Sequence, residues 1–457
     1  MLSFPLEYPV SFALFLVVIA CIVQAWFFKK DFFNPPTVYC FSQCITLGIA
    51  YFQYNKTMTD FQFKTWLFWI GAMIAFCVGA YLSRLTAKSL GEPVRVVEAT
   101  VPENYNWKLH VALSFIPFVL FLVGIFGIIQ KAGNLLLLTD NLSHWMRKET
   151  DYGYYSVLFS SGPLCVLLFG AASFSKFNPL KSIRWLARFM VLLTIVLNLF
   201  AYPNRGTLFF SAGILVILFN YLRKRISALW ILVFLVLAAA GFIAISSLRD
   251  QYQGNSVQGM AFKAMIDLPY KYVSNNYWNF DYAINPPPDR EYHPHTYGID
   301  FFFGMFEFFQ VPGSFRYSLG WDGLFNERIE KVHGLNTASY LWEVYKDLYA
   351  PGVFIFPFFV GLALTLMHLR LCRRGFTPRV LLLYTMLIYI IGWWFFTPGY
   401  KQGIYWAWAI FVFCITTASM GKVRRVPSAP DLKALEAEPP VLQEIDCEDK
   451  GQQQVSA

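Results

Sequence analysis

The sequence predicts an all-α polytopic integral membrane protein with about eleven transmembrane helices and one large extracytoplasmic loop that carries short interfacial helices. Two observations predict this class. Hydrophobic residues make up 56% of the chain and charged residues only 14%, against about 25% charged residues in soluble proteins. Apolar windows of about 20 residues, enough to cross a hydrocarbon core of about 30 Å, also recur along the chain.

These windows divide the chain into four parts. Helices one to eight with short loops occupy 1–247, a large loop occupies 248–351, helices nine to eleven occupy 352–421, and a tail occupies 422–457. The first window lacks a preceding basic region and a small-residue cleavage site, so we expect a retained helix rather than a signal peptide. The predicted spans are 9–28, 36–54, 64–83, 109–130, 153–175, 185–202, 207–222, 227–247, 352–371, 380–397 and 404–420.

Basic residues predict the orientation of these spans. Most Lys and Arg residues of the short loops fall on one side: Lys29, Lys30, the 84–108 loop, Lys176, Lys181, Arg184, 223–225, the 370–379 turn, Lys422, Arg424 and Arg425. The positive-inside rule makes that side cytoplasmic and puts the N-terminus outside. The formal charge of +9 is therefore explained mostly by membrane topology, and some of it is expected to contact anionic lipid. A nucleic-acid partner is not needed to explain it. The Pro-, Glu- and Gln-rich tail is predicted to be a disordered cytoplasmic extension.

The cysteines predict neither an external disulfide framework nor a metal site. None of the eight lies in the large outer loop, where an extracytoplasmic disulfide framework would have to form. Cys40 and Cys44 share a helix face, but no His or carboxylate accompanies them, so helix packing is favoured over metal binding.

The large outer loop is the only extramembrane segment long enough to build a site. Segment 299–309 is too short to span and too apolar for open water, so we expect it to be re-entrant or interfacial. Segment 259–282 is predicted to be an amphipathic helix at the same level. Together these segments suggest a lid shaped for a lipid-borne substrate.

Three cations near the outer ends of the spans are candidates for binding a diphosphate. Arg205 lies in a tight turn between two spans, Arg249 ends the eighth span, and Arg147 lies in the polar insert after the fourth. A guanidinium forms bidentate, charge-assisted hydrogen bonds to phosphate. The alternative is that these side chains simply reach for lipid headgroups.

Three loop histidines are candidates for proton transfer. His293 and His295 flank Pro294, and His333 follows later in the loop. An imidazole with a pKa near about 6.5 can accept a proton from a hydroxyl nucleophile. His293 and His295 could also form a metal pair, but no further ligand cluster accompanies them, so no metal is expected.

The last part of the loop carries the densest polar pattern: His333-x-x-Asn336-Thr337-x-x-Tyr340-Leu, a six-residue gap to Asp347, then Pro351-Gly352 opening a helix. This pattern resembles the signature segment of Wzy-type O-antigen and oligosaccharide repeat-unit polymerases, over about 35 residues. It is also similar to the His-Asn segment of O-antigen ligases. The chain differs from the ligase form because Asn336 lies three residues after His333. It differs from the commonest polymerase form because Ala350-Pro351-Gly352 stands in place of Phe-Gly-x-x-Gly.

The resemblance implies a membrane-integral C-type glycosyltransferase that uses undecaprenyl-diphosphate-linked oligosaccharides and needs neither cofactor nor metal. It implies a bacterial inner-membrane location with a periplasmic active site, and partners that include a chain-length regulator and a flippase. On this basis the candidate catalytic residues are His333, Asp347 and Asp300. The diphosphate-binding candidates are Arg205, Arg249 and Arg147. The acceptor and sugar-binding candidates are Asn336, Thr337, Tyr340, Arg290, His293 and His295.

Three other functions remain open. An O-antigen ligase would use a similar segment for a single transfer. A lipid-linked oligosaccharide flippase or other transporter is better marked by mid-membrane ionisable residues and repeated halves, and neither is visible in the sequence. A non-catalytic scaffold would leave the polar density between His333 and Asp347 without a purpose.

Overall fold

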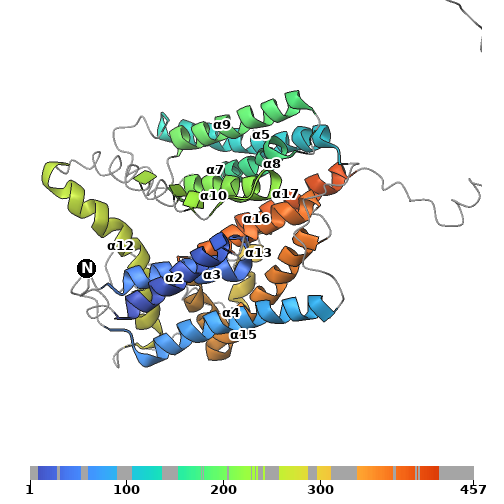
Figure 1. The fold of residues 1–457 in the computed structure, drawn as a ribbon. Helices are drawn as coiled ribbons and strands as arrows, with labels where there is room; N and C mark the ends of the chain where they lie inside the picture. The colour runs from blue at the N-terminus through green and yellow to red at the C-terminus, as the bar shows by residue number, and fades with distance from the viewer. Residues whose placement is uncertain are drawn as a thin grey trace, which may run out of the picture.

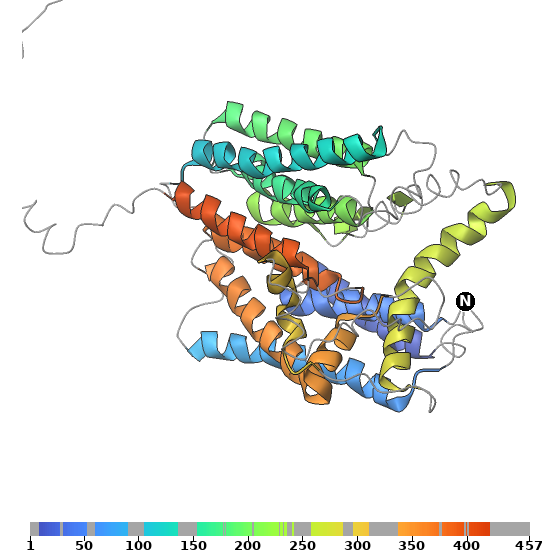
Figure 2. The ribbon, with the colours of Figure 1, turned by 180° about the vertical axis from the view of Figure 1, so that it is seen from behind.

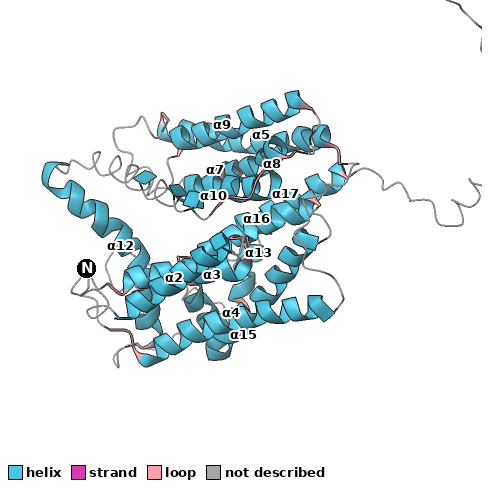
Figure 3. Ribbon diagram, viewed as in Figure 1, coloured by secondary structure: helices cyan, strands magenta, loops and turns pink. Residues whose placement is uncertain are grey.

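The structure, a computed structural model, describes residues 9–27, 31–52, 60–89, 105–135, 153–176, 178, 180–202, 205–227, 229–231, 233–234, 240–241, 257–286, 296–309, 337–373, 377–396, 399 and 402–420. Within these ranges the regular secondary structure is helical throughout, apart from one isolated bridge between Tyr105 and Met420 (Figure 3). The predicted all-α class is confirmed. The elements are α2 (Pro9–Phe27), α3 (Pro35–Ala50), α4 (Phe63–Ser89), α5 (Trp107–Ala132), α7 (Tyr154–Phe159), α8 (Gly162–Phe174), α9 (Lys181–Ala201), α10 (Arg205–Leu222), α12 (Val257–Ile284), η3 (Asp300–Phe302), α13 (Phe303–Phe308), α15 (Tyr340–Arg373), α16 (Pro378–Gly392) and α17 (Gly403–Ser419).

Several of these helices have the length and composition of membrane spans. In the described part of the chain, five are long and apolar enough to cross a membrane: Phe63–Thr86, Trp107–Ala132, Tyr154–Phe174, Lys181–Ala201 and Tyr340–Cys372. Four shorter apolar helices accompany them: Pro9–Ala25, Gly206–Leu222, Pro378–Gly392 and Gly403–Ser419. Each predicted window overlaps a described helix except 227–247, most of which lies outside the described residues. These features agree with an all-α membrane protein.

The helices form two groups joined by a central pair. Helices α5, α7, α8, α9 and α10 lie together at the top of Figure 1, while α2, α3, α4 and α15 lie below, and α16 and α17 lie between the groups. The view from behind shows the same arrangement (Figure 2). Helix α12 leans against the lower group, where it packs on α3, α4 and α15.

Helix α3 lies at the centre of the lower group. Asn34 caps its first turn by accepting a hydrogen bond from Thr37 N at 3.2 Å, and Pro35 follows at the first helical position, where its missing N–H costs nothing. The predicted packing role of its cysteines is confirmed. Cys40 Sγ lies 3.5 Å from Cys77 Sγ, and the thiol of Cys44 lies 3.8 Å from Met73 Sδ.

Glycines let α4 and α15 approach backbone to backbone. A Cβ at Gly79 would lie 2.1 Å from the Phe358 carbonyl oxygen, and one at Gly361 would lie 2.3 Å from the Phe76 carbonyl oxygen. Small residues at such crossings allow the close van der Waals packing that holds membrane helices together. The α4–α15 pair therefore forms a tightly packed unit.

One end of the bundle, here called the basic end, gathers residues from many helices. Asp31 contacts Tyr221 at the end of α10 and His368 near the end of α15. Arg379, at the start of α16, donates a hydrogen bond of 2.6 Å to Thr417 near the end of α17. The basic stretch 223–225 follows α10 directly. The structure thus brings together residues that the sequence predicted to share one side.

The opposite end, here called the signature end, carries segment 337–352, the described part of the His333–Gly352 pattern, which is called the signature segment below. Lys64, at the start of α4, donates a hydrogen bond of 2.8 Å to the Ile284 carbonyl at the end of α12. The backbone N–H of Tyr340, which opens α15, donates to the Trp394 carbonyl beyond α16 at 3.0 Å. Helix α15 therefore runs from the signature end to the basic end, and α16 runs back.

The outer loop differs from expectation in two respects. The helix predicted from Pro351 begins earlier, at Tyr340, and is interrupted at Tyr349, where the backbone is not helical (φ 62°, ψ −165°). Pro351 explains the break, because it has no N–H and its ring clashes with the carbonyl of Asp347 four residues earlier.

The second difference concerns α12. Every residue from 274 to 281 is buried, so this half of the helix is enclosed by the bundle and does not lie on its surface as an amphipathic helix would. Segment 299–309 is helical as η3 and α13, and α13 packs against α17.

Candidate functional site

The residues predicted from sequence fall into three groups in the structure. The side chains of Thr337, Tyr340 and Asp347 are described, while Asp300 and Arg205 are placed by their backbone as the first residues of η3 and α10. All five belong to the signature end. The other candidates lie outside the described residues: His333, Asn336, Arg147, Arg249, Arg290, His293 and His295.

Asp347 connects α15 to the segment that contains Asp300. Asp347 is 4% exposed. Thr296 Oγ1 and Gly298 N each donate to Oδ1 at 2.7 Å, and Phe301 N donates to Oδ2 at 2.9 Å. Hydrogen bonds to an ionised carboxylate are among the strongest in proteins. With both oxygens engaged, the geometry favours a positioning role for Asp347 over proton abstraction.

The backbone around Asp347 is strained. Tyr297 (φ 50°) and Tyr349 (φ 62°) both adopt the left-handed conformation, next to Gly298 (φ 94°). Each non-glycine residue in this region costs about 1–3 kcal/mol and persists only when the surroundings enforce it. The three hydrogen bonds to Asp347 and one of 3.2 Å from Thr296 N to the Lys346 carbonyl supply that enforcement. Strain of this kind concentrates at functional sites.

Tyr340 is fully enclosed by protein. Its hydroxyl is hydrogen bonded to the Tyr39 hydroxyl, and its ring stacks on Trp394 at a centroid distance of 4.3 Å. The side chain is 0% exposed. These contacts with Tyr39 and Trp394 anchor the start of α15. Contact between Tyr340 and the acceptor sugar stays a prediction.

Thr337 is held from α12. The side-chain amide of Asn279 donates a hydrogen bond of 2.7 Å to the Thr337 carbonyl, and Asn279 itself is completely buried. The Thr337 side chain is half-buried. The backbone at Thr337, where the described part of the segment begins, is thus fixed to α12.

Two further residues at this end were not singled out from the sequence. Asp281 of α12 is buried and accepts hydrogen bonds from the Thr65 hydroxyl and, at 3.1 Å, from Gln62 N at the beginning of α4. Lys64 lies over the Tyr345 ring at 5.3 Å. The polar residues concentrated in 274–281 could have indicated from the sequence that Asp281 belongs to a polar site.

A cluster of buried aromatic rings, here called the aromatic wall, packs next to Tyr340 at the start of α15. Tyr39 stacks on Phe76 at 4.1 Å, and Trp69 lies 4.7 Å from Tyr277. Next to this wall, the side-chain amide of Gln43 is completely buried and makes no hydrogen bond to the described part of the protein. An unpaired buried amide costs about 1–3 kcal/mol, so Gln43 is a polar group without a structural partner in the described interior.

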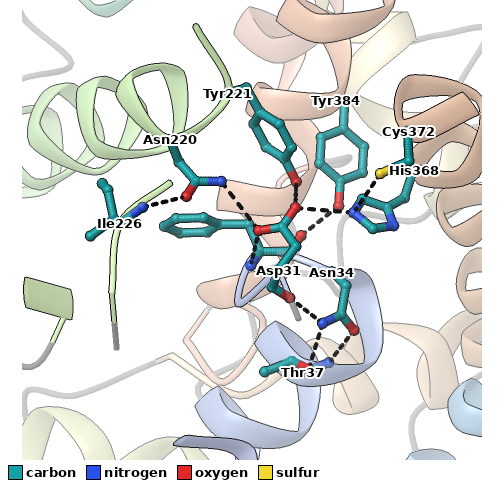
Figure 4. A network of polar contacts seen from close by, with 10 residues as sticks. Asp31, Asn34, Thr37, Asn220, Tyr221, Ile226, His368, Cys372 and Tyr384 are labelled. Atoms are coloured by element: carbon teal, nitrogen blue, oxygen red, sulfur yellow. Dashed lines mark hydrogen bonds and ion pairs between the residues drawn. The ribbon is translucent and has the colours of Figure 1, made fainter. Parts of the chain in front are cut away.

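A second polar centre lies at the basic end, around Asp31 (Figure 4). The Tyr221 hydroxyl and His368 Nε2 donate to Asp31 Oδ2 at 2.5 and 3.1 Å. Asn220 Nδ2 and Phe33 N donate to Oδ1 at 3.2 and 3.1 Å. Burial by itself would raise the pKa of the Asp31 carboxyl, but the hydrogen bonds from His368 and Tyr221 outweigh it and lower the pKa below its ordinary value.

This centre does not have the geometry of a thiol catalyst. Cys372 Sγ lies 3.6 Å from His368 Nε2, the same ring nitrogen that donates to Asp31. In a Cys-His-Asp relay the thiol and the carboxylate engage different ring nitrogens. Because both partners meet one nitrogen here, the network holds segments together and does not activate a nucleophile.

Neither centre forms a metal cage in the described ranges, where no group of three or more His, Cys, Asp or Glu residues could hold a metal ion. His293 and His295 lie outside those ranges.

The chain was also compared with known proteins. No protein-family model, no curated protein and no solved structure matches it.

Proposed function

We propose that this protein polymerises undecaprenyl-diphosphate-linked oligosaccharide repeat units at the extracytoplasmic face of the bacterial inner membrane. The observation that carries the proposal is the construction of the signature segment. Asn279 holds its backbone at Thr337 and Asp347 fixes its other end to segment 296–301, and the backbone is strained at Tyr297 and Tyr349. This is how a site that must hold reacting groups in place is built.

The location of the segment supports an extracytoplasmic reaction. The signature end lies opposite the basic end, and basic residues favour the cytoplasm. A site on the outer side has no access to nucleotide-sugars, so the sugar donor must arrive attached to a lipid. We therefore infer that a flippase supplies the substrate, that a chain-length regulator limits the product, and that the 422–457 tail is cytoplasmic.

In the proposed reaction the growing glycan leaves its lipid diphosphate. A hydroxyl of the incoming lipid-linked repeat attacks the anomeric carbon, the bond from that carbon to the diphosphate oxygen breaks, and the hydroxyl proton passes to a base. His333 is the leading base, with Asp300 as its rival. The departing diphosphate already carries negative charge, so Arg205, Arg249 and Arg147 need only hold it and stabilise the added charge.

The described residues support this reaction by positioning. Asp347 holds the segment that begins η3, and therefore Asp300, against α15. Lys64 adds a positive charge to the same end of the bundle, next to Tyr345. A displacement of about 1 Å in such a site costs on the order of a hundredfold in rate.

The test is a reconstitution of the full chain in lipid with a short-prenyl diphosphate-linked repeat unit, with products resolved by size. We expect a ladder spaced by one repeat unit for the wild type and its loss in His333→Ala and Arg205→Ala. Arg188→Ala is the matched control, because Arg188 lies over the Trp185 ring on α9 at 4.9 Å, away from the site.

Other outcomes would replace the proposal. A single transfer to a different acceptor, such as lipid A core, would identify a ligase. Movement of intact lipid-linked substrate across the bilayer without transfer would identify a transporter.

A further inference from the structure

The two helices that carry candidate residues at the signature end meet again at the basic end. Helix α10 begins with Arg205 and ends at Leu222, and α15 begins with the signature segment and ends at Arg373. Near their far ends, both bind the same carboxylate, that of Asp31 (Figure 4).

The contacts to α10 come from its last turn. Tyr221 donates to Oδ2 at 2.5 Å and Asn220 donates to Oδ1 at 3.2 Å. Asn220 also accepts a hydrogen bond of 2.9 Å from Ile226 N, beyond the helix end. These bonds fix both the rotation and the height of the α10 end.

The contact to α15 is an ion pair. His368 Nε2 lies 3.1 Å from Asp31 Oδ2, with both side chains buried. The same histidine packs near the Tyr384 ring of α16, with centroids 5.6 Å apart, and the Tyr384 hydroxyl donates to the Phe33 carbonyl at 2.5 Å. The end of α15 is therefore held at the same point as the end of α10.

Helices transmit this constraint to the opposite end. The 18 residues of α10 rise about 27 Å at about 1.5 Å per residue. An α-helix of this length bends only gently, so a shift or rotation at Tyr221 moves Arg205 as well. The part of α15 between the break at Tyr349 and His368 has a similar length, and it carries the constraint as far as Ala350 in segment 337–352.

We propose that Asp31 is a positioning residue that ties α10 to α15 at the basic end and thereby sets the distance between Arg205 and the signature segment at the other end. The tie itself follows from the contacts above, while its effect on the diphosphate rests on the proposed function. Asp31 acts through Arg205 and touches no substrate.

Hydrogen–deuterium exchange of the full chain in lipid tests the tie without reference to activity. In Asp31→Asn we expect amide exchange to rise about tenfold in the first half of α10 (206–214) and in segment 340–348. The matched control is Asn34→Ala, which removes the cap of α3 and a hydrogen bond to the Asp31 carbonyl. It leaves in place the Asp31 carboxylate and its partners on α10 and α15. Exchange confined to 31–37 in both variants would overturn the proposal.

Tyr221→Phe is a second variant that tests the tie even if Asp31→Asn does not fold. It deletes only the hydroxyl on the α10 side, and we expect faster exchange in 206–214 with 340–348 unchanged. Equal changes in both helices, or in neither, would contradict separate contacts to one carboxylate.

A binding cycle with undecaprenyl diphosphate tests the action through Arg205. We expect Asp31→Asn to weaken binding about tenfold in the wild-type background and to have no further effect in Arg205→Ala. Additive losses would mean that Asp31 does not act through Arg205. If the wild type binds no lipid diphosphate while the exchange result holds, the proposed function fails and the tie stands.

Discussion

At the scale of single residues, Asp347 is the best-defined group of the candidate site. Three donors from segment 296–301 converge on its two oxygens. Asp347→Asn would turn an N–H group toward the backbone N–H of Gly298 or Phe301. We expect a loss of about 1.5–3 kcal/mol in the free energy of unfolding and a fall in transfer rate of about 10- to 100-fold, measured by thermal unfolding and by the ladder assay.

Thr296→Val is the graded control, because it removes one donor and leaves the two backbone bonds in place. We expect an intermediate effect on both measurements. If Asp347→Asn abolished transfer while amide exchange in 296–301 stayed at the wild-type rate, Asp347 would be the base and not a positioning residue.

Asp31 predicts a dependence of stability on pH. Its pKa is lowered in the folded protein, by His368 and Tyr221 against the effect of burial and with a smaller contribution from the charge of Arg225. The ionised form is therefore favoured by folding. Its contribution to stability is complete above the ordinary aspartate pKa of about 3.9 and is lost as the pH falls through the lowered pKa.

We therefore expect wild type and Asp31→Asn to differ most in thermal stability at neutral pH and to converge below about pH 4. Unfolding midpoints between pH 7 and pH 3 in one detergent measure this convergence. A difference that did not change with pH would assign the network to packing alone.

At the scale of elements, the α4–α15 crossing determines how closely the signature helix sits. A methyl group at Gly79 or Gly361 would meet a backbone carbonyl at 2.1 or 2.3 Å. We expect Gly79→Ala and Gly361→Ala each to cost about 1–3 kcal/mol in the free energy of unfolding, because the helices must move apart.

Gly392→Ala is the control for this comparison, since its nearest new contact is Val38 Cγ1 at 3.7 Å, an ordinary van der Waals distance. We expect it to be near neutral. Equal thermal stability of all three variants would show that α4 and α15 can move apart at the crossing with little loss of stability.

At the scale of the whole molecule, the helices separate a basic end from a signature end, and the proposal requires the basic end to face the cytoplasm. We expect a phosphatase reporter that works only outside the cytoplasm to be active after Ala132, where α5 ends, and inactive after Ser89, where α4 ends. The opposite pattern would put the signature segment in the cytoplasm and exclude a lipid-linked donor presented from outside.

Much of the fold and part of the site could be predicted from the sequence. Apolar windows located most helices because a spanning helix needs a long run of apolar residues, and the packing role of Cys40 and Cys44 followed from a shared helix face. The burial of Tyr340 could not be predicted, because it depends on Tyr39 and Trp394, which are distant in sequence. Asp31 was missed because its partners come from three separate segments.

The sequence by itself therefore determined the helical class, the membrane character and the segment in which polar groups concentrate, since these depend on local composition and spacing. Only the tertiary structure decided what the charged residues do. A carboxylate such as Asp347 or Asp31 looks like a free acid in a sequence. Its role follows from which donors reach it, and those donors are brought together by helix packing over long distances along the chain.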